Sequence, residues 1–196
     1  MLQIIRHSEN IVNGIVATLC LITYCSLALP IYLLPVSGQH HGASPPAASI
    51  GDRNISLDFK TLPSFVRTGQ DAEMKIGFVD EKAKKSVNHV TFRMDISKDG
   101  KNLLSEFFHS HEGTVNLLFR DNIKSVSPPN YTVGATSDVL TNAWIADPGS
   151  PIIVRGGEIF SQLGTYKAVI EVTTMDNDKT DLPQPIKYEF DIPVLE

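Results

Sequence analysis

Two histidines, His109 and His111, stand two residues apart in the stretch FFHSHEGTV, at the end of an alternating segment. Residues i and i+2 of an extended strand point to the same face, so both imidazoles could reach one ion. Imidazole is a ligand that copper and zinc both accept. Two ligands hold a metal poorly, so a third donor is required, and His89, Glu112 and Asp191 are the candidates.

The availability of His89 depends on the register of the hairpin around Asp99-Gly100, a pair that favours a tight turn. A turn with a glycine bulge sets His89 opposite His109. A plain two-residue turn matches Phe92 with Phe107 and leaves His89 on the other face of the sheet. We expect the plain turn because its cross-strand pairs are better, and this register counts against a site of three histidines.

Two further interpretations of HSHEG stay open. The segment fits the polar end of a strand before a turn at Gly113, and it also fits a pH-sensitive contact or partner surface. The pair His40-His41 is a weaker metal candidate because it lies in a segment without fixed structure. The segment DNDKTD at residues 176–181 has calcium-type ligands, but it lacks the glycine and the final glutamate of an EF-hand, which favours a solvated hairpin loop.

No motif of a known catalytic machinery occurs in the chain. The sequence has no G-x-S-x-G elbow, no P-loop, no dinucleotide fingerprint and no H-E-x-x-H. We therefore expect a protein that is not an enzyme. The 17 basic and 22 acidic residues give a net charge of −5 without a basic stripe, so nucleic acid is not an expected partner.

The elements that would position these histidines are strands. Hydrophobicity alternates with a period of two wherever a pattern is clear, and no amphipathic helix is evident outside the N-terminal region. The expected strands fall at residues 55–59, 72–80, 89–96, 103–108, 114–119, 165–172 and 186–194. This pattern predicts an all-β fold, an antiparallel Ig-like or Fn3-like β-sandwich of about seven strands.

A long passage at residues 122–164 does not fit this pattern. It is rich in Pro and Gly, and it contains the only tryptophan, Trp144. Irregular chain of this length is unusual in a compact sandwich. It is either an elaborated crossing between the sheets or a functional loop.

The N-terminal region predicts a membrane anchor. Residues 11–34 are largely apolar and lack Asp, Glu, Lys and Arg, and as a helix they would extend about 36 Å, enough for a hydrocarbon core of ~30 Å. A cleavable signal peptide is the rival interpretation, but the apolar run is longer than a signal peptide requires. We favour an uncleaved helix in contact with membrane lipid.

The chain then divides into four parts. A short cytoplasmic N-terminus is expected at residues 1–10, a transmembrane anchor at 11–36, a flexible tether at 37–51 and an extracytoplasmic β-sandwich domain at 52–196. Sequons at Asn54 and Asn130 agree with a location outside the cytoplasm. Both cysteines, Cys20 and Cys25, lie in the apolar segment, so the outer domain has neither a disulfide nor a thiolate metal site.

The stretch SKDGKNLLSEFFHSHEGT resembles membrane-anchored Ig-like β-sandwich surface proteins of ammonia-oxidising archaea. In these proteins a DG hairpin precedes an H-x-H-x-G turn and, later, a G-x-Y strand, which is Gly164 to Tyr166 in this chain. The likeness covers residues 72–172. The resemblance implies a location at the cell surface that faces the space outside the cytoplasmic membrane, and copper enzymes are abundant in that space. It implies no activity.

These observations favour a non-enzymatic, single-pass membrane protein whose outer domain binds another membrane or surface protein, for instance as an accessory subunit of a membrane complex. The alternative is a copper- or zinc-binding protein that uses His109, His111 and a third ligand such as His89. Apart from such a metal, no cofactor is expected.

Overall fold

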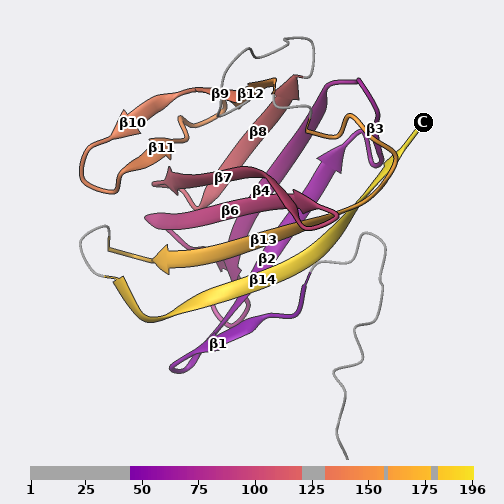
Figure 1. The fold of residues 1–196 in the computed structure, drawn as a ribbon. Helices are drawn as coiled ribbons and strands as arrows, with labels where there is room; N and C mark the ends of the chain where they lie inside the picture. Colours follow the sequence, from indigo (N-terminus) through magenta and orange to yellow (C-terminus); the bar gives the residue numbers. More distant parts are fainter. Residues whose placement is uncertain (1–44, 121–130, 157–158, 178–180) are drawn as a thin grey trace, which may run out of the picture. The chain divides into compact units, whose positions relative to one another are not determined.

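The computed structural model describes residues 45–120, 131–156, 159–177 and 181–196, and their strands form two sheets of seven strands each (Figure 1). The strands of the first sheet, in spatial order, are β1 (Ala48–Ile50), β2 (Arg53–Leu62), β4 (Ala72–Asp80), β8 (Thr114–Arg120), β12 (Ile152–Gly156) and β9 (Tyr131–Gly134), with β5 (Lys85–Ser86) paired to β4. The strands of the second sheet are β10 (Thr136–Asp138), β11 (Ala143–Ile145), β7 (Lys101–Ser110), β6 (Val90–Lys98), β13 (Gly164–Thr174), β14 (Asp181–Leu195) and β3 (Val66–Arg67).

The two sheets share one apolar core. Along β8 and along β13 from Tyr166 the buried residues alternate with more exposed ones, because successive side chains of a strand point to opposite faces. Phe78 of the first sheet contacts Phe92 and Tyr188 of the second, with ring centroids 5.3 and 6.5 Å apart. Each sheet therefore buries one face against the other.

The predicted all-β class is confirmed. Six of the seven predicted segments lie within a long strand, and the seventh, residues 89–96, begins one residue before β6. The predicted number of about seven strands is too low, because seven short strands extend the sheets. Four of these, β9 to β12, lie in the passage expected to be irregular. In that passage β11 pairs in parallel with β7, and β12 pairs in parallel with β8.

The predicted N-terminus, anchor and most of the tether, together with the sequon at Asn130, lie outside the described residues. In the part of the chain that the structure describes, no helix has the length and apolar character needed to cross a membrane. The end of the expected tether forms β1, which pairs with β2.

The β6–β7 hairpin has the predicted two-residue turn, but its register is shifted by one residue. Lys98 pairs with Lys101, and an irregularity next to Ile96 then leaves one extra residue, Leu103, on β7. This β-bulge sets Phe92 opposite Phe108. The predicted pairing of Phe92 with residue 107 is therefore wrong. The bulge lets Leu104 and Phe108 both reach the core, where each is fully buried.

Candidate metal centre

Three histidines meet at one corner, where the chain twice passes between the sheets. His89 lies in the connection from β5 to β6, His109 near the end of β7, and His111 in the connection from β7 to β8. The hairpin bulge shifts the register so that Thr91 faces His109. If this antiparallel pairing is extended two residues beyond Thr91 and His109, His89 lies opposite His111. The main-chain N–H of His89 indeed donates to the carbonyl of His111 over 3.1 Å.

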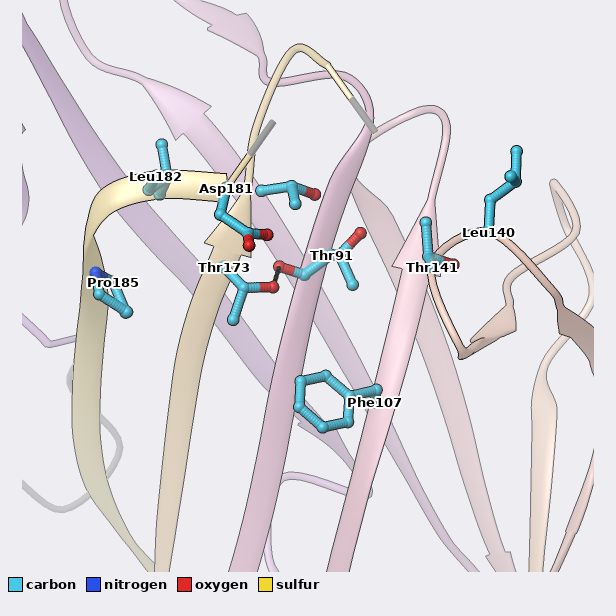
Figure 2. A pocket seen from close by; sticks show the side chains of 9 residues that line it. Thr91, Phe107, Leu140, Thr141, Thr173, Asp181, Leu182 and Pro185 are labelled. Carbon is cyan, nitrogen blue, oxygen red and sulfur yellow. Dashed lines mark hydrogen bonds between the residues drawn. The ribbon is translucent and has the colours of Figure 1, made fainter. Parts of the chain in front are cut away.

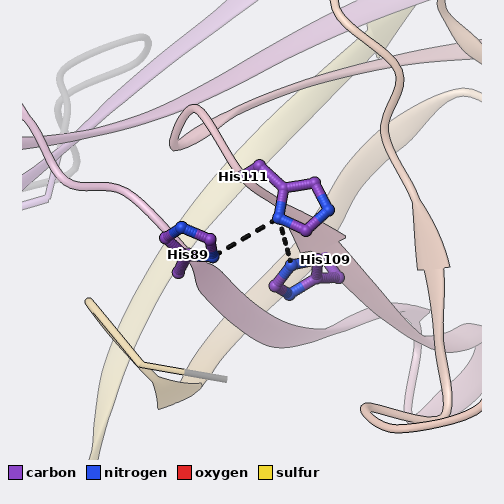
Figure 3. Close-up of side chains that lie close together, drawn as sticks. All are labelled: His89, His109 and His111. Carbon is purple, nitrogen blue, oxygen red and sulfur yellow. Dashed lines mark hydrogen bonds between the residues drawn. The ribbon is translucent and has the colours of Figure 1, made fainter.

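The side chains of the three histidines point toward one another (Figure 3). Nε2 of His109 lies 3.3 Å from Nδ1 of His111, and that Nδ1 lies 3.3 Å from Nδ1 of His89. One nitrogen from each ring lies within 4.8 Å of the others. Two nitrogens bound to zinc at 2.0–2.1 Å in a tetrahedral site are themselves about 3.3 Å apart. Two of the nitrogen pairs thus already have the separation that a tetrahedral metal needs.

The ring of His109 is held by a second contact on its far side. Nδ1 of His109 shares a hydrogen bond of 2.9 Å with Oγ1 of Thr91, the residue directly across β6. His109 is fully buried, whereas His89 is half-buried and His111 is exposed. For Nε2 of His109 to bind a metal, its Nδ1 must carry the proton and donate it to the threonine.

The two connections that carry His89 and His111 are built for a close approach. Ser110 closes the β7–β8 turn, because its Oγ donates to the carbonyl of Thr114 and accepts from the Thr114 N–H, at 2.8 and 3.0 Å. Gly113 follows with φ of +72°, and a Cβ at this position would lie 1.8 Å from the carbonyl oxygen of Val87. Only glycine fits where the two connections touch.

His89 itself adopts a left-handed backbone conformation, with φ of +50°. Such a conformation is uncommon for a residue with a side chain, and residues of this kind cluster at ligand sites. The backbone of His89 is thus held by its surroundings in the position that brings its ring to the other two.

One carboxylate, that of Asp138 at the end of β10, acts on the cluster. Hydrogen bonds from the main chain of Leu140 and from the side chain of Thr141 lower the pKa of Asp138, and charge on His109 acts in the same direction. Asp138 therefore stays ionised, and its negative charge favours a cation at the cluster.

The other predicted ligands are not part of the cluster. Among the described residues, the group with metal-ligand geometry contains the three histidines without Glu112 or Asp191. Asp191 lies opposite Lys167 on β13, which in turn lies opposite Ser97, far along the sheet from the histidines. Thr91 and Asp138 did not stand out in the sequence, because each depends on the pairing of strands whose order the sequence does not show.

The calcium interpretation of residues 176–181 gains no support. The carboxylate of Asp176 pairs with the guanidinium of Arg53, and Asp181 begins β14. Residues 178–180 lie outside the described residues, as do His40 and His41.

No family model matches the chain, and no curated protein matches it at a significant level.

Proposed function

We propose that this protein binds one zinc or copper ion through His89, His109 and His111. The observation that carries the proposal is the convergence of three imidazole nitrogens within 4.8 Å of one another. One ring is fully buried and held by a threonine. A metal ligand in proteins commonly has such a partner on its second ring nitrogen, which fixes the tautomer and the orientation of the ring.

The type of donor decides the class of metal. Calcium and magnesium prefer oxygen ligands, whereas imidazole suits zinc and copper. Of zinc(II) and copper(II), the Irving–Williams order predicts that copper(II) binds a given nitrogen site more tightly. The separation of 3.3 Å between nitrogens suits a tetrahedral ion, which supports zinc and copper(I).

The test is a calorimetric titration of the purified full chain with zinc and with copper(II). The chain has six histidines, so His7, His40 and His41 are first changed to alanine, which leaves the three of the cluster. His111→Ala is the main variant, since His111 is exposed and its loss leaves the core intact. The control is Glu112→Gln, which changes an exposed neighbour in the same connection.

We expect one ion to bind per chain, with an affinity that His111→Ala reduces at least about 30-fold and Glu112→Gln leaves unchanged. Equal binding by the His111→Ala variant and its parent would refute the proposal.

The fold that carries this site is, we infer, an Ig-like or Fn3-like sandwich. Its seven long strands divide as β2, β4 and β8 in one sheet and β7, β6, β13 and β14 in the other. Tyr166, near the start of β13, donates its hydroxyl to the carbonyl of Gln162 and accepts from the Gln162 N–H, both at 3.1 Å. A tyrosine that bonds back to the chain just upstream is the tyrosine corner of Ig-like domains.

We place the domain outside the cytoplasm, attached to the cell membrane by the N-terminal apolar segment, with no enzymatic role. The support is in the sequence, in the uncharged residues 11–34 and the resemblance to archaeal surface proteins. Protease treatment of intact and of lysed cells tests this location. Cleavage of the domain in lysed cells alone would contradict it.

A second candidate function, binding of another membrane or surface protein, rests on the turn between β10 and β11. Val139 and Leu140 are adjacent there and are 95% and 78% exposed. Large apolar side chains side by side at a loop tip suit a protein contact. Cross-linking in native membranes should capture a partner with the natural chain, and a Val139→Ser/Leu140→Ser variant should lose it.

A further inference from the structure

A pocket of about 460 Å³ opens on the outer face of the second sheet, and Thr91, which bonds to His109 of the metal centre, is one of its lining residues (Figure 2). Its walls come from β6, β7, β13, the start of β14 and the β10–β11 turn. Four threonines and the carboxylate of Asp181 supply the polar lining, and Phe107 and Leu182 are among the apolar residues. This volume lies in the range of sites for small organic ligands.

An irregularity in β13 turns two neighbouring threonines toward this pocket. Strict alternation would place Thr174 on the same face as Val172, which is fully buried in the core. The register shifts between these two residues, so Thr174 lies opposite Thr91 on β6. Thr173 and Thr174 therefore both line the pocket. Bulges often occur beside binding sites, where they redirect a side chain.

One of these hydroxyls has no hydrogen-bond partner among the described residues. Thr173 donates its Oγ1 to the main-chain carbonyl of Thr91 over 3.2 Å, and Oγ1 of Thr91 is bonded to His109. Oγ1 of Thr174 is buried and makes no hydrogen bond to any residue that the structure describes, although Thr174 is only 5% exposed. A buried hydroxyl without a partner destabilises the fold, so it calls for an explanation.

We propose that the pocket binds a small organic molecule that donates hydrogen bonds and has one apolar face, which is the chemistry of a sugar or of an alkylammonium ion. Thr174 and Asp181 supply acceptors for its donor groups, and Phe107 and Leu182 supply an apolar wall. The described lining residues include no Lys or Arg, so the pocket does not favour an anion. This proposal does not depend on the metal.

The test follows the threonine methyl groups by NMR in the full chain labelled at threonine, titrated separately with methyl glucoside and with butylammonium. The methyl groups of Thr173 and Thr174 should shift with at least one probe, and the shifts should saturate. Thr165, exposed at the opposite end of β13, is the internal control and should not move. No saturable shift below about 10 mM of either probe overturns the proposal.

Two variants connect binding to the residues. Thr174→Val keeps the shape and removes the unsatisfied hydroxyl, so it should raise the melting temperature while it weakens binding about five- to tenfold. Asp181→Asn should weaken butylammonium at least about tenfold and methyl glucoside less, which distinguishes an ammonium site from a sugar site. A Thr174→Val variant that binds as well as the natural chain overturns the assignment, and Thr165→Val is the matched control.

Discussion

Oγ1 of Thr91 and Nδ1 of His109 lie 2.9 Å apart in the interior of the second sheet, directly across the β6–β7 ladder. This contact leaves Nε2 of His109 as the nitrogen that faces His111.

The loss of the Thr91 hydroxyl should therefore weaken metal binding although no ligand is removed. Thr91→Val should reduce the zinc affinity about 10–100-fold, and Thr91→Ser should restore most of it, because serine keeps the oxygen. Calorimetric titration of both variants measures this. Similar affinities in the two would show that the oxygen does not orient the ring.

Metal should stabilise the fold, because the three ligands come from two connections and one strand that meet only in the folded chain. At a free zinc concentration about 100 times the dissociation constant, the melting temperature should rise by roughly 5–10 °C. EDTA should reverse the rise, and His111→Ala should abolish it. Thermal unfolding followed by circular dichroism measures the effect, and a rise that survives in the variant would point to zinc bound elsewhere.

Gly113 should tolerate no side chain. Gly113→Ala combines φ of +72° with a Cβ only 1.8 Å from the carbonyl oxygen of Val87, so it should destabilise the protein by about 3 kcal/mol or more. Gly100→Ala is the matched control, since Gly100 has φ of +79° with nothing within 4 Å, and it should cost only about 1–2 kcal/mol. Urea unfolding compares the two, and equal losses would mean that the connections do not touch as described.

The hydroxyl of Tyr166 should contribute to stability through its two hydrogen bonds to Gln162. Tyr166→Phe keeps the ring in the core and should lower the free energy of unfolding by about 1–2 kcal/mol. Urea unfolding detects such a change. A variant as stable as the natural chain would remove the tyrosine corner as support for the Ig-like assignment.

Two tyrosines should ionise late in the folded protein. Burial raises the pKa of Tyr131 to about 12, with Glu106 acting in the same direction, and burial likewise raises the pKa of Tyr188 to about 12. The fold therefore favours the protonated phenols. The stability gained is fully present below the unfolded pKa of about 10, and it is lost as the pH rises to about 12.

Absorbance at 295 nm measures this ionisation. Tyr131 and Tyr188 should form tyrosinate only near pH 12, and Tyr131→Phe and Tyr188→Phe should each remove one late step. A tyrosinate titration that is complete by about pH 11 would contradict the assignment.

The long strands could be predicted from the sequence because one face of each is mainly apolar and the other mainly polar. Ile186, Tyr188 and Ile192 alternate with polar residues, and all three are buried on the same face of β14. The short strands could not be predicted. β11 consists of three residues, Ala143–Ile145, which are too few to show an alternation of apolar and polar side chains. Its extended conformation is stabilised by pairing with β7 rather than by its own sequence pattern.

The candidate site was only half predictable for a related reason. The spacing of His109 and His111 placed both on one face, but the position of His89 depended on Leu103, an apolar residue that looks like an ordinary member of its strand. Whether such a residue is bulged is decided by packing across the sheet, where Leu104 and Phe108 both become buried. A shift of one residue reverses which face a side chain occupies.

The corner that joins β5 to β6 and β7 to β8 is where the chain leaves one sheet for the other, and the three histidines lie on it. An ion bound there would link the β5–β6 connection to the β7–β8 connection where the two sheets meet. Under a pulling force, the order in which the sheets separate would then depend on whether the ion is present.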